Sequence, residues 1–556
     1  MIGVAVQPSE QAAAKELFEL CKTPWEIYCP DKSYEVLLCT TPPPATGNCR
    51  LILLFGAETT AFDTEHNLEL LQQNAGTFVV HAGNRFPLYG KAATFPSSPL
   101  QLVTAEASLQ PLLAARRVNG STIIRIGYNL LDEIHRLLTT GQPIVHAGIA
   151  TLDLHLSLLR DLITRAGIPL VEIPPVPEGY DFMACLTHDI DHPVLRNHRW
   201  DHTMFGFLQR ATFGSFAKFF RGRIPFNSLC KNWLAAGKLP FVHLGWARDF
   251  WQEFARDYLA IEAGLGATYF FITERDNPGR KADGSRASMR ACSYEISELL
   301  PQLKMIMTAG NEVGVHGLDA WRDADAGRRE QARVAQVTGA TEIGIRMHWL
   351  YFDENSPAVL DQAGFTYDST VGYNQTVGYR AGTTQVFQPP ATVRLLELPL
   401  HVMDTALFYP TYLSLDESAA FERVSSMINR MAASGGVLTF NWHDRSLAAD
   451  RLWGNIYVRI IQKMKNQHAW FPTAAQAVGW FRKRRGARLE LIKAESGRLR
   501  VRGQLDQPDL LPGLKIRIHQ ALRCQPDEYL ASGTAATFSD ERFDKITEVN
   551  LTYSHE

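Results

Sequence analysis

The apolar run Phe182-Met183-Ala184-Cys185-Leu186 leads directly into Thr187-His188-Asp189-Ile190-Asp191, and this stretch decides the fold of the middle of the chain. In a strand, alternate side chains share a face, so Asp189 and Asp191 would lie side by side at its end. Two neighbouring carboxylates can divide the work of a metal-assisted hydrolase, because one can bind a cation while the other acts as a base. A solvated loop, or a helix N-cap by one of the aspartates, is the other interpretation, and this stretch alone leaves both open.

Further segments typical of buried strands alternate with helical patterns as far as about residue 483. Such alternation predicts an α/β fold with a parallel sheet or barrel, whose functional groups gather at the carboxyl ends of the strands. Those ends carry His316, His348 and His443. The segments are residues 267–272, 312–316, 344–348 and 436–443.

The chain of 556 residues is too long for one core, so several domains are expected. Short apolar runs and helical patterns predict an N-terminal α/β domain of unknown role at 1–174. The proline-rich connector 173–179 resists both helix and central strand and marks its boundary. The central domain then spans 175–483 with a helical insertion at about 193–250, and alternating short runs predict a small β-rich module at 484–556.

Composition excludes several classes of protein. The formal net charge of -2 gives no support for binding nucleic acid, and 46% hydrophobic with 21% charged residues is ordinary for a globular protein. Eight cysteines without CxxC spacing favour neither a zinc ribbon nor a disulfide scaffold, and fit reduced thiols in a cytosol. No basic and apolar leader begins the sequence, and no apolar run reaches about 18 residues, so we expect a cytoplasmic protein without a transmembrane segment.

The strand-end residues have the types that a catalytic metal site needs. Catalytic zinc takes three protein ligands, often His and Asp, and leaves one position open, so Asp191 and His316 are natural first ligands. Arg346 and His348 would share a strand face, where the arginine could orient a carboxylate and the histidine could join the metal. The alternatives are that the histidines have only a structural role and that Arg346 forms a surface ion pair. His443 could act as an acid on a leaving group, or it could simply cap its strand by hydrogen bonding.

Five stretches, taken in order, resemble the motifs of the polysaccharide deacetylases, the NodB-homology family. The resemblance covers about residues 180–480 and implies a distorted (β/α) barrel that binds zinc or a similar cation and removes N- or O-acetyl groups from sugars. The matching stretches are Thr187-His188-Asp189-Ile190-Asp191, Gly264-Leu265-Gly266-Ala267-Thr268-Tyr269-Phe270-Phe271, Gly314-Val315-His316, Arg346 with Gly364-Phe365-Thr366-Tyr367-Asp368-Ser369-Thr370, and Leu438-Thr439-Phe440-Asn441-Trp442-His443-Asp444.

Carried over residue by residue, the family pattern makes Asp189 the catalytic base and Asp191 and His316 metal ligands. It makes Arg346 the residue that orients Asp189, and His443 the catalytic acid. The family's HxxxH motif places a second histidine where this chain has Ala320. We therefore expect His348 to supply the third ligand, with Asp319 as a substitute.

Substrate contacts are predicted from residues near these motifs. Trp349 and Trp442 could stack on sugar faces, although aromatic residues at a barrel mouth are more often packing residues. Asp368 could support the site through hydrogen bonds or could cap a helix. In the insertion, phenylalanines interleave with basic residues over about 203–223, which fits either peripheral membrane contact or a helical lid anchored on its own domain.

The leading interpretation is a metal-dependent carbohydrate deacetylase whose partner is an acetylated sugar or glycan precursor. An amidase acting on a non-sugar substrate is one alternative. A non-catalytic glycan-binding or scaffold protein, whose site decayed with the histidine missing at Ala320, is another. The joint presence of Asp189, Arg346 and His443 favours an enzyme, because an inactive site does not require a base, its orienting residue and an acid.

Overall fold

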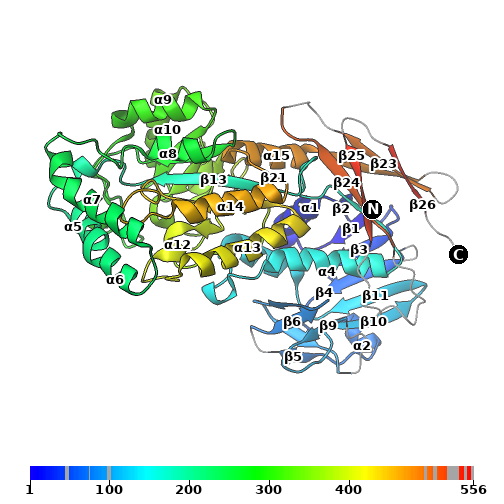
Figure 1. The fold of residues 1–556 in the computed structure, drawn as a ribbon. Helices are drawn as coiled ribbons and strands as arrows, with labels where there is room; N and C mark the ends of the chain where they lie inside the picture. The colour runs from blue at the N-terminus through cyan, green and yellow to red at the C-terminus, as the bar shows by residue number, and fades with distance from the viewer. Residues whose placement is uncertain are drawn as a thin grey trace. The chain divides into compact units, whose positions relative to one another are not determined.

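The computed structural model describes residues 1–43, 49–73, 76–96, 102–493, 498–504, 510–521, 537–543 and 548–552 (Figure 1). Contacts divide the chain into two compact units. The terminal unit contains Met1–Gly179, Ala381–Thr383 and Trp480–Glu556, and the central unit contains Tyr180–Arg380 and Thr384–Gly479. The separation of 484–556 as a module of its own stays a prediction, because these residues group with the N-terminal ones.

The terminal unit is built on a six-stranded sheet with the order β10-β11-β4-β3-β1-β2. The central strands β3 and β4 are buried at every residue, as expected of strands covered on both faces. The pairs from β2 to β11 are parallel, and β10 and β11 form an antiparallel hairpin. The strands are β1 (Ile2–Ala5), β2 (Trp25–Ile27), β3 (Val36–Cys39), β4 (Leu51–Phe55), β10 (Leu113–Val118) and β11 (Ser121–Ile126), and the helices are α1 (Gln11–Cys21), α2 (Ala61–Glu65), α3 (Leu130–Thr139) and α4 (Thr151–Arg165).

Strands from the two ends of the chain meet within the terminal unit. Strand β12 (Leu170–Glu172) pairs with β24 (Leu514–His519), which pairs in turn with β25 (Phe538–Phe543). A second small sheet joins β22 (Arg488–Lys493), β23 (Arg498–Gln504) and β26 (Glu548–Thr552). The rest of the predicted β-rich module, 494–497, 505–509, 522–536, 544–547 and 553–556, lies outside the described residues. The remaining strands of this unit are β5 (Leu71–Gln73), β6 (Phe78–His81), β7 (Asn84–Pro87), β8 (Ala92–Thr94) and β9 (Val103–Ala105).

The central unit has one curled parallel sheet with the order β18-β17-β16-β15-β14-β13-β20-β19, and β21 also pairs with β13. Every pair in it is parallel, and the sheet curls into a half barrel, which confirms the predicted distorted (β/α) barrel. The strands are β13 (Phe182–Ile190), β14 (Ala267–Phe271), β15 (Glu312–Gly317), β16 (Ile345–Met347), β17 (Tyr367–Asp368), β18 (Leu396–Glu397), β19 (Val402–Met403), β20 (Val437–Asn441) and β21 (Ala469–Trp470).

The barrel strands are buried because helices cover the sheet. All nine residues of β13 are buried, and so is every residue of β14 and β20. Parallel strands of this kind carry nearly continuous apolar sequence, which is the pattern that made them predictable. The helices are α8 (Phe254–Ile261), α9 (Leu300–Thr308), α10 (Ala324–Thr338), α11 (Ser356–Ala363), α12 (Asp404–Phe408), α13 (Glu417–Ser434), α14 (Gly454–Asn466) and α15 (Ala474–Gly486), the last of which holds the boundary between the units.

The connection from β13 to β14 contains a helical lobe. Its elements are α5 (His202–Gln209), a π-helical turn (Arg210–Gly214), α6 (Ser215–Phe220) and α7 (Phe226–His243). They lie together in Figure 1 and contact one another. Residues of α5, the π-helical turn and α7 form a hydrophobic core with two flanking residues: Leu195, Met204, Phe207, Ala211, Ala235, Leu239, Val242 and Trp251.

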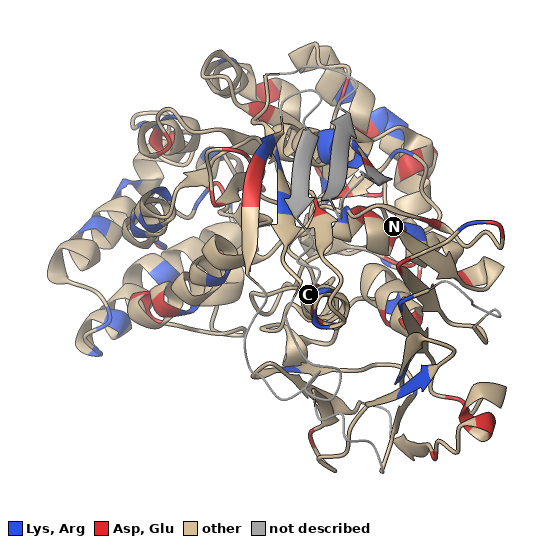
Figure 2. Cartoon of the chain, turned by 90° about the vertical axis from the view of Figure 1, so that its right-hand side faces the viewer, with Lys and Arg blue, Asp and Glu red and all other residues tan. Residues whose placement is uncertain are grey.

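Three general features of the described residues concern their helix length, their charge and their cysteines. None of their helices is both long and apolar enough to cross a bilayer. Acidic and basic residues are interspersed along most of the described ribbon, in keeping with the small net charge (Figure 2). The seven cysteines that the structure describes are free thiols, and Cys524 lies outside the described residues.

Candidate active site

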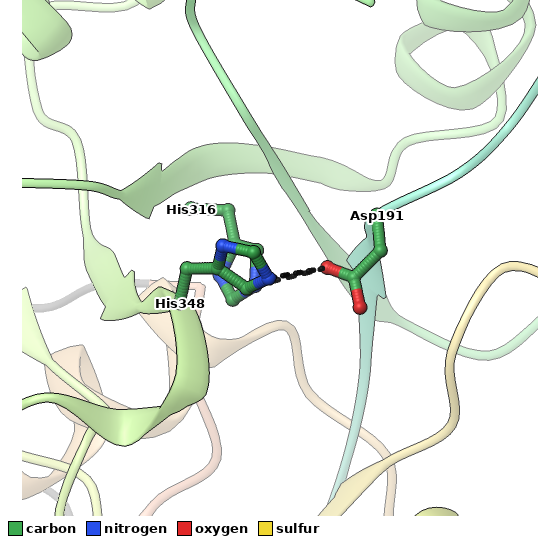
Figure 3. Close-up of side chains that lie close together, drawn as sticks. All are labelled: Asp191, His316 and His348. Carbon is green, nitrogen blue, oxygen red and sulfur yellow. Dashed lines mark ion pairs between the residues drawn. The ribbon is translucent and has the colours of Figure 1, made fainter. Parts of the chain in front are cut away.

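Three predicted ligands converge at the carboxyl ends of neighbouring strands. Asp191 directly follows β13, His316 belongs to β15 and His348 directly follows β16. One ligand atom of each lies within 4.8 Å of the other two. The Nε2 atoms of His316 and His348 lie 3.3 and 3.6 Å from the Oδ1 of Asp191, and both rings point toward that carboxylate (Figure 3).

These three side chains fit a metal ion. Two ligands held tetrahedrally at about 2.0–2.2 Å from one zinc ion lie roughly 3.3–3.5 Å apart, close to the spacing of the imidazole nitrogens from Asp191. Among the described residues, the buried Oδ1 of Asp191 has no hydrogen-bond partner. The Nδ1 of His316 lies 3.0 Å from the carbonyl oxygen of Arg346, so Nδ1 carries the proton and Nε2 presents its lone pair. The cluster is therefore a candidate metal site with room for a further ligand.

The charges of these groups agree with metal binding. Burial raises the pKa of Asp191, but the surrounding imidazoles, that of His348 foremost, lower it to well below its usual value. Burial lowers the pKa of His348 well below the ordinary value, despite the charge of Asp191. An ionised carboxylate next to a neutral imidazole is the state in which both can ligate a cation.

His348, and not Asp319, comes to the position of a third ligand. The His316 and His348 rings lie side by side with centroids 4.9 Å apart. The Oδ1 of Asp319 instead accepts a hydrogen bond of 2.8 Å from the Arg280 main-chain nitrogen, outside the cluster. Ala320, at the position of the missing second histidine, is fully buried. The candidate ligand set therefore takes its third member from the end of the neighbouring strand β16.

Asp189 lies beside the cluster but is held by other groups. Its Oδ1 accepts from Arg346 Nη1 at 3.1 Å, and its Oδ2 accepts from Asn441 Nδ2 at 2.7 Å. The Asn441 amide oxygen also accepts from the Asp189 main-chain nitrogen at 3.1 Å. The Nε2 of His316 is 3.8 Å from the Asp189 Oδ2. Asp189 is therefore a buried, oriented carboxylate within reach of the metal position.

Arg346 is fixed as firmly as the carboxylate that it orients. Its Nη1 donates to Thr187 Oγ1 at 2.6 Å, its Nε to the Ser369 carbonyl at 3.0 Å, and its Nη2 to Ser369 Oγ at 2.8 Å. The guanidinium carbon also lies 4.6 Å from the centre of the Phe270 ring. The side chain is fully buried, so the surface ion pair considered as its alternative does not occur.

His443 is paired with an aspartate from the neighbouring strand's end. Its Nδ1 lies 2.6 Å from the Oδ1 of Asp404, and its main-chain nitrogen donates to the Asp404 Oδ2 at 2.7 Å. Burial lowers the pKa of His443, but the charge and hydrogen bond of Asp404 raise it more, to about 10. The free Nε2 faces the cluster, 3.8 Å from Asp191 Oδ2. The raised pKa favours the protonated ring, whose two nitrogens lie near the carboxylates of Asp404 and Asp191.

Solved structures that are similar to part of this chain include proteins described as polysaccharide deacetylases. One is a Mycobacterium smegmatis protein assigned to that class, with 16% identity and a TM-score of 0.34 over 56% of this chain and 94% of that one. A second is the allantoinase Puue, with 13% identity and a TM-score of 0.36 over 55% and 93%. A third is a CE4 family pseudoenzyme from Bacillus anthracis, with 14% identity and a TM-score of 0.24 over 41% and 60%. No family model and no curated protein matches the sequence.

The site opens into a cavity of about 430 Å³ within the central unit. Asp189, Asp191 and the three histidines line it, together with Trp349 and Tyr351 from the loop after β16. The helical lobe contributes His202, Thr203 and Arg210, and the segment after β19 contributes Tyr409 and Tyr412. The cavity therefore joins charged groups at its base to aromatic side chains at its walls.

Of the three predicted substrate-binding residues, only Trp349 lines this cavity. Trp442 is fully buried and stacks on Tyr457 of α14 with centroids 5.0 Å apart. Alternate residues at a strand end point to opposite faces, so Trp442 points away from the face shared by Asn441 and His443. Asp368 is buried beside Glu397; burial raises the pKa of Asp368 to about 6, and burial raises that of Glu397 well above its usual value. The positions of Trp442 and Asp368 do not support a substrate contact.

Three residues of the site were not singled out by the sequence. Asn441 donates a hydrogen bond to Asp189. The only sequence signal for its place in the site is the i, i+2 spacing from His443, which puts both residues on one strand face. Asp404 precedes His443 by 39 residues, and no local pattern links them. Arg290 donates to the carbonyls of Gly317, Leu318 and His348 at 2.8–3.2 Å and so ties together the ends of β15 and β16.

The loop that carries Trp349 is strained. Trp349 and Leu350 have φ values of 62° and 52°, in the left-handed region that side chains with a Cβ rarely adopt. Each such residue costs about 1–3 kcal/mol unless its surroundings enforce it, and strain of this kind gathers at ligand sites. The bonds of Arg290 to the His348 carbonyl help to enforce it, and Trp349 remains 45% exposed in the cavity wall.

Proposed function

We propose that this chain is a metal-dependent hydrolase that removes acetyl groups from an N- or O-acetylated sugar or glycan precursor. The observation that carries the proposal is the position of Asp189. It is a buried carboxylate outside the ligand cluster, held by Arg346 and Asn441 and facing the metal position. Any buried carboxylate needs partners such as these, but Asp189 also lines the cavity beside the candidate ligands, which is the position that a general base requires.

Asp191, His316 and His348 would hold the cation, and Zn²⁺ fits a donor set of two imidazole nitrogens and one carboxylate oxygen. A cation at this place supplies Lewis acidity, which polarises an acyl carbonyl and lowers the pKa of water. The proton of His316 Nδ1 is committed to the Arg346 carbonyl, which keeps the ring in its ligating tautomer.

Asp189 would take the proton of the attacking water. Its two oxygens are fixed by Arg346 and Asn441, so the carboxylate keeps one rotamer and needs no reorganisation during the reaction. The hydrogen bond from the Arg346 guanidinium is charge-assisted, so it fixes the orientation of the carboxylate more firmly than a neutral donor would.

His443 would protonate the departing amine or alkoxide. Its Nδ1 is committed to Asp404, so the proton that it can give is the one on Nε2, which faces the cluster. Asp404 favours the protonated ring and fixes its orientation. Asp189 and His443 line the same cavity, so the base and the acid would act on one bound acyl group.

The form of the cavity favours a sugar over a small amide. A volume of about 430 Å³ lies in the usual range for small-molecule sites. Trp349 offers an exposed ring, and the Tyr409 and Tyr412 rings, which line the same cavity, stack with centroids 6.1 Å apart. Flat aromatic faces pack well on the apolar faces of sugar rings.

The proposal is tested by acetate release from N-acetylglucosamine oligomers and from an O-acetylated oligosaccharide. The purified protein, loaded with Zn²⁺, should release acetate from at least one of them. Asp189→Asn should keep its metal and lose on the order of 10²-fold or more in rate, because a general base typically contributes that much.

Three outcomes would contradict the proposal or its assigned base. Oligosaccharide binding without acetate release by the metal-loaded protein would indicate a non-catalytic glycan-binding protein. Hydrolysis of simple acyl amides with no preference for acetylated sugars would indicate an amidase. Full activity of Asp189→Asn would reject the assigned base.

A further inference from the structure

We propose that the helical lobe formed by α5, α6 and α7 is a docking surface for an anionic membrane, on which the protein lies without spanning it. The lobe is part of the central unit, and α5 with the turn after it supplies His202, Thr203 and Arg210 to the catalytic cavity. A surface bound by this lobe would therefore lie next to the site.

Exposed aromatic side chains are concentrated on the lobe. Nine of the eleven exposed phenylalanines and tryptophans among the described residues lie between Trp200 and Trp246. Phe213, Phe220 and Trp246 are 80%, 71% and 76% exposed. Exposed apolar area of this extent marks an interaction surface, since single exposed apolar residues are common but clusters are not.

Several of these rings form one continuous patch, which we call the aromatic patch: Phe216, Phe219 and Phe220 of α6, and Phe226 and Trp233 of α7. Phe216 lies 4.5 Å from Phe220 and 6.1 Å from Trp233 between ring centroids. Phe219 lies 5.7 Å from Phe220 and 5.9 Å from Phe226. The rings contact one another and leave their outer faces to solvent, while the lobe's core is filled by other residues.

The charge of the lobe decides what kind of surface it fits. Residues 202–248 contain seven lysines and arginines and no aspartate or glutamate, in a chain whose net charge is -2. Arg221 and Arg223 lie in the turn between α6 and α7, and Lys231 and Lys238 lie on α7. All four are exposed, and no ion pair joins them to an acidic group among the described residues. Strong positive charge around an aromatic patch matches an anionic surface.

Phenylalanine and tryptophan combined with lysine and arginine on short helices is the composition of segments that lie in the membrane interface. The helices of the described residues do not reach the length and apolarity of a spanning segment, so attachment to one leaflet is the mode that fits. Taken with the proposed function, on which this last step rests, the substrate class would be an acetylated glycan carried by a lipid in that membrane.

Flotation with vesicles tests the docking surface directly. The full-length protein should float with phosphatidylcholine vesicles that contain phosphatidylglycerol and remain behind with phosphatidylcholine alone. Binding should weaken at high salt, because screening shortens the reach of surface charges. Absence of flotation with the anionic vesicles would overturn the proposal.

Variants of the lobe separate its two contributions. Arg221→Glu with Arg223→Glu should lower the bound fraction by at least about tenfold, since each basic residue near an anionic surface contributes roughly fivefold. Phe220→Ser with Trp233→Ser should abolish flotation. As matched controls, Arg286→Glu with Lys304→Glu, and Val145→Ser, change exposed residues outside the lobe and should float like the unaltered protein. Equal loss in the controls would overturn the assignment to the lobe.

Two further readouts keep the interpretation clear. Light scattering without lipid reports whether the aromatic patch joins two copies of the chain. Membrane docking would be overturned if the unaltered protein is a dimer that does not float, and if Phe220→Ser with Trp233→Ser dissociates that dimer. Acetate release from a soluble oligosaccharide should be unchanged in Arg221→Glu with Arg223→Glu. Loss of flotation with that activity intact shows that docking and catalysis fail independently.

Discussion

The Nδ1 of His443 lies 2.6 Å from the Oδ1 of Asp404, and this contact fixes the imidazole with its Nε2 facing Asp191. Asp404 is fully buried, and both of its oxygens contact the segment after β20. In addition to the Oδ1 contact, Oδ2 accepts hydrogen bonds from the His443 main-chain nitrogen and the Ser446 hydroxyl. Under the proposed function, Asp404 is a positioning residue, which would act on the substrate only through His443.

Replacing Asp404 by asparagine should lower acetate release on the order of 10²-fold, because an amide cannot accept at both oxygen positions or favour the protonated ring. Metal content should be unchanged, since Asp404 is not among the clustered ligands. Ser446→Ala, which removes one bond to Asp404, serves as a milder control. Activity of Asp404→Asn within about threefold of the unaltered protein would contradict the role of the pair.

The third ligand is tested by metal analysis. His348→Ala should lose at least about 100-fold in zinc affinity, more than the removal of a residue that merely supports a ligand costs. Asp319→Ala is the matched control, because its carboxylate binds the Arg280 nitrogen instead. Zinc content measured after dialysis at fixed free metal should fall only in the first variant. Unchanged occupancy in His348→Ala would reject it as a ligand.

Arg346→Lys tests whether shape or only charge matters at Asp189. The guanidinium bonds Asp189, Thr187 and Ser369 at once, and an ammonium cannot reproduce this fork. The variant keeps a buried positive charge, which avoids the 3–5 kcal/mol or so that an unpaired buried carboxylate costs. We expect metal content near that of the unaltered protein and a rate lower by about 10²-fold. A rate within threefold would show that charge alone suffices.

The sequence predicts the parts of the site that are local to a strand. The i, i+2 pairs Asp189 with Asp191, and Arg346 with His348, follow from strand periodicity once their apolar flanks are recognised. The same periodicity could have excluded Trp442, because it lies between Asn441 and His443 and must point to the other face.

The parts that the sequence does not predict come from chain segments that meet only in the folded protein. Asp404 is 39 residues from His443, and Arg290 is 58 residues from the carbonyl of His348. The pairing of β12 with β24 joins residues more than 340 positions apart, as Leu170 with His519. Neither hydrophobic periodicity nor residue spacing carries information about such contacts, whereas the helical lobe, whose core is local, could be predicted as a unit.

Glu330 gives a pH dependence that is separate from the catalytic groups. This residue of α10 is buried, and its two oxygens accept from the Leu318 and Asp319 main-chain nitrogens at 3.0 Å each, which holds the turn after His316. Burial raises the pKa of Glu330 from 4.5 to about 7, although those two bonds lower it.

A carboxyl whose pKa is higher in the folded state binds a proton there before it does in the unfolded chain. Its contribution to the free energy of unfolding is therefore fully present below pH 4.5 or so and is lost as the pH rises through about 7. The size is on the order of 3 kcal/mol, because each tenfold difference in proton affinity between the folded and unfolded states corresponds to about 1.4 kcal/mol.

Glu330→Gln cannot titrate, so the melting temperature of the unaltered protein minus that of the variant should be largest near pH 5 and should shrink toward pH 8. Glu354→Gln, at an exposed position, should leave no such pH-dependent difference. Thermal melts at fixed zinc across this range decide the matter: a difference that is constant with pH, or that grows as the pH rises, would show that Glu330 is already ionised in the folded protein at pH 5.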